Sequence, residues 1–569
     1  MPDADLILLH APSVYDFRKK AILYGPVSDV VPSSQIFEMY PIGFLTLLEY
    51  LQRHGYSVRI INVALRMLKS RRFDAEKLIR SLEPVAFGLD LHWLVHAQGS
   101  LELAGIIKKH HPDIPVIFGG ISASYYHEEL IRYPQVDHVI RGDSAEEPLR
   151  RLISAIKENG PLKEVPNLTW KEGGRVRINE SSHVPAEMDD VVFDYRKVMR
   201  STARHLDFSG HLPFRGWLRY PIVAALSCRG CVHNCVTCGG SASAYERTCG
   251  RKSPAYRGPE LLARDIAVAA RHIRAPVIVL GDILQAGEEY ARQFLKALRS
   301  EHVRNHVALE FFSPPPRQVL EAAADAVPNF NIQISPESHD EKIRRRFGRP
   351  YANASLEGML KDARQLGCKR IDVFFMIGLP GQTPGSVADT VGYCAELLER
   401  HGPDVHPYIS PLAPFLDPGS RAFENPEKHG YRLFSKSLED HRRASLSPSW
   451  KYTLNYETEW MTRDELVSST YDAALALNRL KAKYGLLRRK TARRIEKRIE
   501  REQQLMHGID KICSTEDEPT REKSIEKLMG RFVCVGPSTI CDEDEMKWPK
   551  KFFPFNPLRL IQGALTGGQ

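Results

Sequence analysis

Two long regions of this 569-residue chain alternate short apolar runs with amphipathic stretches, and this alternation limits the possible folds most strongly. In residues 1–160, the runs DLILLHAP, SVRIINV, PVAFGLD, PVIFGG and VDHVIRG have the length and composition of buried strands. Stretches with helical spacing of apolar residues lie between several of them. Such alternation predicts parallel sheets covered by helices, with ligands at the carboxyl ends of the strands.

The same patterns divide the chain into four predicted segments. Residues 1–160 are expected to form a doubly wound parallel sheet of α/β type, and residues 161–220 a connector that contains a Gly-Gly hairpin. Residues 221–430 show six strand–helix units, which predict a partial or complete parallel barrel with its active site at the strand C-termini. Residues 431–569 mix apolar and charged residues at helical spacing and predict a mostly helical C-terminal domain.

The cysteines are concentrated in one short segment, SCRGCVHNCVTCGGS, directly after the first predicted strand of the barrel. No cysteine precedes Cys228, and Cys231, Cys235 and Cys238 follow it closely. One tight cluster of this kind indicates metal binding and not a disulfide framework. The spacing Cys231-x3-Cys235-x2-Cys238 can ligate three irons of a cubane cluster and leave the fourth iron open.

Other interpretations of the cysteines remain open at this point. Structural zinc favours four ligands in two separated pairs, and no second pair is present near the motif. By count alone, either Cys228 or Cys231 could begin the triplet, and unligated structural cysteines are a further alternative. Cys513, Cys534 and Cys541 could build a second cluster, although their spacing fits no standard motif.

Charge and hydropathy restrict the location and partners of the chain. The formal net charge is +9, and much of the excess lies in Lys481–Arg501, which predicts a solvated helix face or a docking surface for an acidic protein or nucleic acid. No apolar window has the length of a membrane span, and the acidic N-terminus lacks a basic leader. We therefore expect a cytoplasmic protein without a membrane contact, for which nucleic acid is a less favoured partner than protein.

The form Arg-Gly-Cys-x3-Cys-x2-Cys resembles the motif of the radical S-adenosylmethionine (SAM) superfamily, in which the cysteine after Arg-Gly begins the triplet. The resemblance implies that Cys231, Cys235 and Cys238 hold a [4Fe–4S] cluster whose open iron binds SAM. Cys228 then lies outside the ligand set, at a position usually occupied by Ser or Thr. The segments LGD, SPES and MIGLPGQT also resemble the superfamily, which implies SAM contacts at Gly281, Asp282, Glu337, Ser338, Gly378 and Pro380.

The N-terminal part resembles the cobalamin-binding domain of the cobalamin-dependent, class B radical SAM methyltransferases. The matching pieces are YPIGFLTLLEYLQRHGYSVRIIN, the stretch from PVIFGG to RRLI, and VPNLTW. The Asp-x-His-x-x-Gly signature that supplies a histidine to cobalt elsewhere is absent, and a weak or missing lower ligand suits methyl transfer. A vestigial sheet without cobalamin is the alternative, whereas the lack of G-x-G-x-x-G disfavours a phosphate-binding Rossmann domain. The resemblance implies cobalamin contacts at His92, Trp93, Gly119, Gly120, Ser122 and Gly142.

Together these resemblances imply a C-methyltransferase that acts on an unactivated sp3 carbon. One SAM would methylate cob(I)alamin, and a second would be cleaved to a 5′-deoxyadenosyl radical that abstracts hydrogen from the substrate. An external one-electron reductant is required. The C-terminal region resembles an archaeal-type subgroup, which implies a peptide or protein substrate such as the glutamine that is methylated in methyl-coenzyme M reductase.

Three other functions compete with this hypothesis. A cobalamin-dependent radical SAM enzyme could perform cyclisation or ring rearrangement without methyl transfer. A tRNA-modifying methylthiotransferase would need further cysteines before the motif, and residues 1–227 contain none. A non-catalytic sensor is disfavoured by the well-preserved SAM segments. The aromatic residues between Trp450 and Trp460 could cap the active site, but core packing is the more ordinary role of such side chains.

Overall fold

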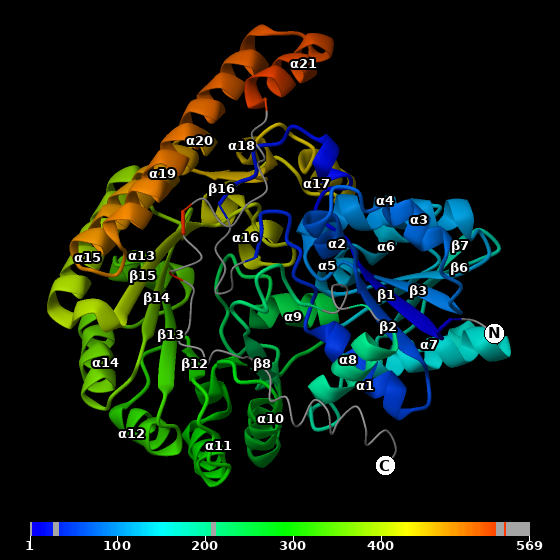
Figure 1. The fold of residues 1–569 in the computed structure, drawn as a ribbon, viewed down its shortest axis with the longest axis horizontal. Helices are drawn as coiled ribbons and strands as arrows, with labels where there is room; N and C mark the ends of the chain where they lie inside the picture. Colours follow the sequence, from blue (N-terminus) through cyan, green and yellow to red (C-terminus); the bar gives the residue numbers. More distant parts are fainter. Residues whose placement is uncertain are drawn as a thin grey trace.

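The computed structural model describes residues 3–26, 33–205, 207, 212–530, 540–541 and 545. Figure 1 shows two sheets beside each other, the first in blue and cyan on the right and the second in green on the left. The orange C-terminal helices lie along the upper left flank of the second sheet. The molecule thus has the α/β architecture that the strand–helix alternation predicts.

The first sheet has the strand order β2-β1-β3-β4-β5-β6-β7. Its first five strands run parallel, and their side chains are almost all buried because helices cover both faces. The strands are β1 (Leu6–His10), β2 (Val58–Asn62), β3 (Ala86–Asp90), β4 (Val116–Gly119), β5 (His138–Ile140), β6 (Leu168–Glu172) and β7 (Arg175–Ile178).

The predicted hairpin forms, but it belongs to the first sheet and is not a free connector. Strand β6 pairs antiparallel with β5, with Leu168 opposite Ile140, so the sheet continues beyond the predicted boundary at residue 160. The hairpin partner β7 is exposed at the edge of the sheet. The helices of this part are α1 (Gly43–Arg53), α2 (Val63–Lys69), α3 (Ala75–Arg80), α4 (Ala97–His110), α5 (Ile121–Tyr125), α6 (His127–Leu130), α7 (Glu146–Glu158) and α8 (Tyr195–Arg204).

The second sheet is an open, all-parallel sheet of six strands in the order β15-β14-β13-β12-β11-β8, so the predicted barrel is partial. A separate antiparallel pair consists of β9 (Cys228–Arg229) and β10 (Ala255–Tyr256), and β9 follows the first strand of the second sheet closely in the chain. The main strands are β8 (Val223–Leu226), β11 (Val277–Leu280), β12 (Val307–Phe311), β13 (Phe330–Glu337), β14 (Ile371–Ile377) and β15 (Val405–Pro411). The helices are α9 (Ala242–Cys249), α10 (Pro259–His272), α11 (Glu288–Ser300), α12 (Arg317–Ala326), α13 (Glu341–Phe347), α14 (Asn353–Gln365) and α15 (Pro384–His401).

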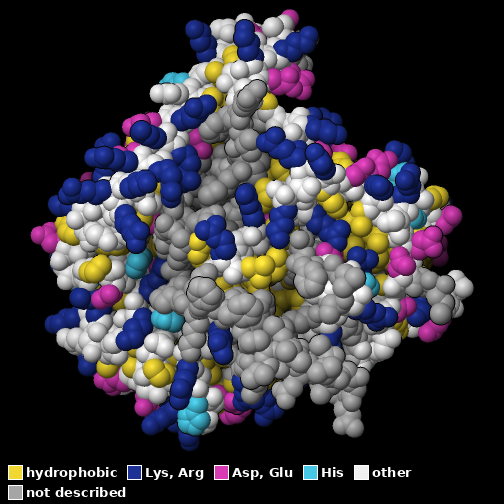
Figure 2. Space-filling view, in the orientation of Figure 1, with side chains coloured by type: hydrophobic (Ala, Val, Ile, Leu, Met, Phe, Trp, Pro, Cys, Tyr) yellow, Lys and Arg dark blue, Asp and Glu magenta, His cyan; other side chains and the backbone are white. Residues whose placement is uncertain are grey.

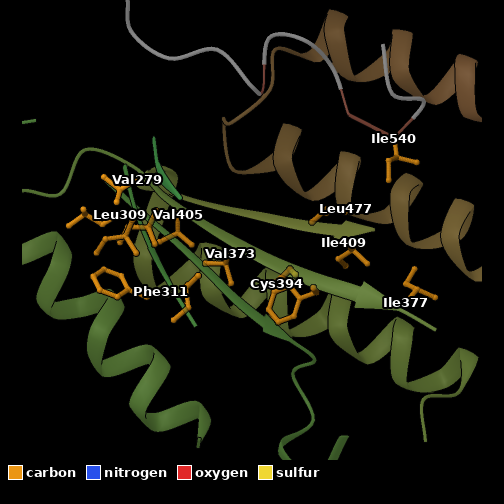
Figure 3. Close-up of a cluster of buried hydrophobic side chains, with 14 of the residues drawn as sticks. Val279, Leu309, Phe311, Val373, Ile377, Cys394, Val405, Ile409, Leu477 and Ile540 are labelled. Carbon is orange, nitrogen blue, oxygen red and sulfur yellow. The ribbon is translucent and has the colours of Figure 1, made fainter. Parts of the chain in front are cut away.

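The C-terminal region shares a core with the second sheet and does not fold apart from it. Helix α19 packs on α15 and β15. Figure 3 shows Leu477 of α19 and Cys394 of α15 in one buried cluster with Val373 and Ile409 from the strands. The elements of this region are α16 (Arg421–Glu424), β16 (Tyr431–Leu433), α17 (Leu438–Ala444), α18 (Trp450–Thr453), β17 (Tyr456–Thr458), α19 (Arg463–Lys483), α20 (Arg489–Thr515) and α21 (Glu518–Met529).

The basic run at Lys481–Arg501 is largely a solvated helix face. Figure 2 shows Lys and Arg side chains gathered at the upper left, over α19 and α20. One face of α20 is buried through Ile495 and Ile499, while most of its cationic residues are exposed. Lys481 is the exception because it is buried and pairs with Glu545 at 2.5 Å. Within the described residues, no helix is both long and apolar enough to cross a bilayer.

Trp450 joins the N-terminal segment to the C-terminal helices. Its backbone N–H donates to the Leu23 carbonyl at 3.0 Å, and the Leu23 N–H donates to the Pro448 carbonyl at 2.9 Å. The indole N–H donates to the Tyr471 hydroxyl at 3.0 Å. Trp450 is only 4% exposed, so the predicted core role of this aromatic residue fits the structure.

We predict that Trp450→Ala lowers the free energy of unfolding by about 3–5 kcal/mol, because it leaves a cavity where two parts of the chain meet. The shift of the thermal unfolding midpoint measures the effect. The control is Leu446→Ala, since Leu446 is 38% exposed and its loss should change stability by at most about 0.5 kcal/mol. Equal shifts in both variants would show that Trp450 does not hold the joint together.

Candidate active site at the junction of the two sheets

The cysteine loop begins directly after β8 and lies at the carboxyl edge of the second sheet. The Cys231 sulfur accepts the His233 backbone N–H at 3.4 Å, and the Cys238 sulfur accepts the Gly240 N–H at 3.3 Å. Burial raises the pKa of Cys231 to about 11 and also raises the pKa of Cys238. Coordination by metal favours the thiolate and offsets this cost, so the loop suits metal ligands better than free thiols.

The sulfurs of Cys231, Cys235 and Cys238 do not all lie within 4.8 Å of one another, as the ligands of a single ion would. Among the described residues, only His10, Asp90 and His96 bring three potential ligand atoms within 4.8 Å of one another. The three cysteine sulfurs are therefore farther apart than the ligands in such a compact group. A cubane takes each thiolate on a different iron, which requires this wider arrangement.

Carboxyl groups surround the space next to the cysteine loop. Asp282 follows β11 and accepts the backbone N–H groups of Leu284 and Phe312, each at 2.8 Å. Burial raises the pKa of Asp282 to about 6. Glu310, on β12, accepts the Gly281 N–H at 2.9 Å, and burial raises its pKa as well.

Glu337 ends β13 in the left-handed backbone region, with φ of +65°. It is 7% exposed, and burial raises its pKa to about 7. Arg349 lies 3.6 Å from the Glu337 carboxyl and also contacts the Cys235 thiol. Three carboxyl groups (Asp282, Glu310 and Glu337) therefore face one nearby guanidinium, an imbalance that favours a cationic ligand such as the ammonium group of SAM.

The strand ends that carry the other predicted SAM residues are held by buried contacts. Arg344 is fully buried and donates to the Ser338 carbonyl at 2.8 and 3.0 Å. Gly378 has φ of +102°, and a Cβ at this position would lie 2.2 Å from the Tyr456 hydroxyl. Pro380 follows in the same turn after β14. All six predicted SAM residues thus lie at the same carboxyl edge as the cysteine loop.

A cavity of about 290 Å³ lies at the carboxyl edge of the first sheet and reaches the cysteine loop. Its first-sheet wall is largely apolar, with Leu8 and Ile117 among its residues, and the second domain contributes Cys228, Arg229 and Tyr245. A cavity of this size and lining suits an apolar part of a ligand. Four of the predicted cobalamin residues line it, namely His92, Gly119, Gly120 and Gly142.

Trp93 and Ser122 do not line this cavity. Ser122 is buried within α5. The Trp93 ring packs edge-on against Phe37 and Phe415, and its indole donates to Asp417. Asp417 also accepts the Gly239 N–H at 3.0 Å, so Trp93 connects the first sheet to the cysteine loop instead of facing the cavity.

Two buried ion pairs also connect the cysteine loop region to the first sheet. Arg229, within the cysteine motif, pairs with Glu146 at 2.5 Å, and Glu146 accepts the Thr46 hydroxyl at 2.7 Å. Arg251 pairs with Asp143, the residue after Gly142. The loop that bears the cysteines therefore forms part of the wall of the first-sheet cavity.

Sequence reasoning missed Glu310, Arg349, Asp417 and the Arg229–Glu146 pair. Glu310 carries a signal, because it is a charged residue within the otherwise apolar strand VALEF. Asp417 and Glu146 carry none, since their roles depend on partners that are far away in the chain. These partners become visible only when the two sheets are placed together.

Two family models match the chain. Residues 33–153 match the B12 binding domain, and residues 226–394 match the radical SAM superfamily. An uncharacterized methyltransferase of Pyrococcus horikoshii is 24% identical over 202 residues, which cover 35% of this chain and 40% of the relative. The anaerobic magnesium-protoporphyrin IX monomethyl ester cyclase of Synechocystis is 24% identical over 134 residues, 23% of this chain and 24% of the relative. The chain thus matches less than half the length of each of these relatives.

Solved structures share the fold of most of the chain. The methyltransferase TsrM of Kitasatospora setae, with cobalamin and a [4Fe–4S] cluster bound, has a TM-score of 0.55 at 15% identity and covers 84% of this chain and 89% of its own. The cobalamin-dependent radical enzyme OxsB, with aqua-cobalamin and SAM bound, has a TM-score of 0.56 at 15% identity and covers 92% and 74%. These matches confirm the predicted fold class, and the family models support the predicted set of cluster, SAM and cobalamin. The chain therefore combines a B12-binding domain with a radical SAM domain.

Proposed function

We propose that this chain is a cobalamin-dependent radical SAM C-methyltransferase that methylates an unactivated sp3 carbon of a peptide or protein residue. The observation that carries the proposal is the shared wall between the two sites. Cys228 and Arg229, from the cysteine motif, line the cavity of the B12-binding domain. An enzyme that used only the cluster and SAM would not need its cysteine loop to line the cavity of a B12-binding domain.

The protein residues position the cofactors and control the charge around them. When bound, the cluster and cobalamin supply electron transfer into SAM and the carriage of a methyl group. Cys231, Cys235 and Cys238 hold three irons, and Asp282, Glu337 and the nearby Glu310 offset the positive charge of SAM. The surrounding buried carboxyls replace water as partners of that charge.

The cobalamin side depends on backbone that can approach the ligand closely. Gly119, Gly120 and Gly142 line the cavity with their backbone, and Gly120 and Gly142 have positive φ values that favour glycine. The apolar wall at Leu8, Gly88 and Ile117 suits the aromatic base of the nucleotide tail. His92 completes the proposed contacts within the cavity, and Trp93 and Ser122 support the loops around it.

We propose a peptide or protein as the methyl acceptor, with the glutamine of methyl-coenzyme M reductase as the first candidate. This choice is supported by the resemblance of the C-terminal region to an archaeal-type subgroup. The exposed cationic side of α20 suits docking to an acidic protein surface. An external one-electron reductant in the cytoplasm would supply electrons to the cluster.

The products of turnover test the proposal. We predict that the holoenzyme, given SAM, cobalamin, a one-electron reductant and a glutamine-containing peptide, forms methylated peptide together with S-adenosylhomocysteine and 5′-deoxyadenosine. Mass spectrometry measures all three, and the reaction without cobalamin is the control. 5′-Deoxyadenosine with a rearranged or cyclised product and no methylation would contradict methyl transfer and support the competing ring chemistry.

We predict that the triple variant C231A/C235A/C238A loses its cluster iron and its 5′-deoxyadenosine formation. Iron quantitation after anaerobic reconstitution provides the measurement. The matched control is Cys228→Ser, which should keep the cluster because Cys228 lies outside the proposed triplet. Residual cluster iron in the triple variant would require another site. Cys513 and Cys541 would then be tested first, whereas Cys534 lies outside the described residues.

The raised pKa of Glu337 predicts how the stability of the protein depends on pH. Burial raises its folded-state pKa to about 7 from the usual 4.5, so the folded state holds this proton more tightly than the unfolded state. Its contribution to stability is complete below about pH 4.5 and is lost as the pH rises through about 7. We predict that Glu337→Gln flattens the pH dependence of the thermal midpoint, whereas exposed Glu289→Gln does not. An unchanged dependence in Glu337→Gln would show that this carboxyl titrates normally.

A further inference from the structure

Three histidines and one aspartate form a network where β1 and β3 end, beside the cavity of the B12-binding domain. The His10 Nδ1 lies 2.9 Å from one oxygen of Asp90, and the His92 Nδ1 lies 2.6 Å from the other. The His96 ring packs against both histidines, with centroid distances of 4.7 and 4.9 Å. His10, Asp90 and His96 are buried, whereas the His92 side chain is 30% exposed and lines the cavity.

The hydrogen bonds determine which nitrogen of His92 is available to a ligand. A carboxylate only accepts hydrogen bonds, so Nδ1 of His92 carries the proton that it shares with Asp90. The neutral ring then has its lone pair on Nε2, which has no hydrogen-bond partner among the described residues. A carboxylate that accepts from one imidazole nitrogen fixes the tautomer and makes the other nitrogen a better metal ligand.

The remainder of the network supports His92 and does not hold an ion of its own. The ligand atoms of His10, Asp90 and His96 lie within 4.8 Å of one another, but both nitrogens of His10 and both carboxylate oxygens of Asp90 already have partners. The His10 Nε2 donates to the Phe37 carbonyl at 3.1 Å, and the His96 Nδ1 donates to the Ala11 carbonyl at 3.1 Å. These contacts hold the His10 ring, which in turn holds the Asp90 carboxylate. His96 also keeps a lone pair on Nε2, but it is 1% exposed and does not line the cavity, so His92 is the histidine that can offer its lone pair to a ligand there.

The backbone around His92 is held in place by the neighbouring strand. The Leu91 N–H donates to the Gly119 carbonyl at 2.8 Å, and the Ala123 N–H donates to the Leu91 carbonyl at 3.0 Å. A Cβ on Gly120 would lie 2.5 Å from the Cα of His92. Gly120 has φ of +115°, so this close approach and this conformation both require glycine. The ring is therefore presented to the cavity from a fixed loop.

We propose that His92 is the axial nitrogen ligand of cobalt in the bound cobalamin, and that Asp90 and His10 are positioning residues for it. The inference rests on the proposed function, because it requires cobalamin in this cavity. It departs from the sequence-based expectation of a weak or missing lower ligand. The full Asp-x-His-x-x-Gly signature is absent because Val95 stands at its last position, but the carboxylate and the imidazole are both in place.

Electron paramagnetic resonance of the holoenzyme in the cob(II)alamin state tests this inference. An axial ¹⁴N ligand splits the cobalt lines into triplets, while water or an empty position leaves them unsplit. Because the benzimidazole tail of cobalamin also contains nitrogen, the protein is labelled with ¹⁵N and loaded with unlabelled cobalamin. We expect triplets from unlabelled protein and doublets from ¹⁵N-labelled protein, which assigns the nitrogen to the chain.

Variants then identify the residue. His92→Ala and His92→Gln should bind cobalamin and give unsplit lines, whereas His183→Ala, which changes a histidine of a neighbouring cavity, should keep the splitting. Asp90→Asn should give a mixture of split and unsplit spectra with bound cobalamin, since it removes the anionic acceptor without deleting the ligand. Equal cobalamin content, measured by absorbance, shows that each variant is folded.

The outcomes separate this inference from the function on which it rests. If the wild-type protein binds no cobalamin, both the proposed function and the axial ligand are wrong. If it binds cobalamin but its lines are unsplit, or remain triplets after ¹⁵N labelling, His92 is not the ligand and the proposed function stands. Splitting that persists in His92→Ala with ¹⁵N label would assign the nitrogen to another residue of the chain and overturn the inference.

Discussion

The Arg229–Glu146 ion pair is the contact on which the arrangement of the two sites depends. Arg229 belongs to the cysteine motif, and Glu146 begins the helix after β5 of the other sheet. Removing one partner of such a buried pair leaves an uncompensated charge and costs about 3–5 kcal/mol, so the two sheets have little freedom to separate here. The Arg251–Asp143 pair and the Trp93–Asp417–Gly239 contacts act in the same direction. The cysteine loop and the cavity of the first sheet are thus positioned by common contacts.

Charge is distributed differently at the two sites. Beside the cysteine loop, Asp282, Glu310 and Glu337 outnumber Arg349, and burial raises the pKa values of all three carboxyls. At the first sheet, Asp90 is already surrounded by two imidazoles. The first site is therefore prepared for a cation, whereas the second presents a neutral nitrogen and a largely apolar wall. This contrast matches the different chemistry of SAM and of cobalamin.

Much of this architecture could be predicted because it is local in sequence. Hydrophobic periodicity predicts most of the strands, and the cysteine spacing predicts the metal-binding loop. The connector was misjudged because the pairing of Leu168 with Ile140 adds a hairpin to a sheet that otherwise looked complete. Asp417 and Glu146 could not be identified because their partners lie far away in the chain, and local patterns contain no information about such pairs. Asp90 and His92 stand out in the sequence only as residues at a strand end, since their tautomer depends on geometry.

The position of α19 has a consequence for how the protein is made. This helix covers apolar side chains of β14 and β15, including Val373 and Ile409, and its own Leu477 fills the cluster between them. The first sheet can bury most of its core as soon as it leaves the ribosome, because its helices alternate with its strands and only a few later residues, such as Phe415 and Leu438, join that core. The second sheet must wait until residues 463–483 have been synthesised, and until then it exposes an apolar face. The interval between these two events is the period in which a nascent chain is most exposed to aggregation and most dependent on chaperones.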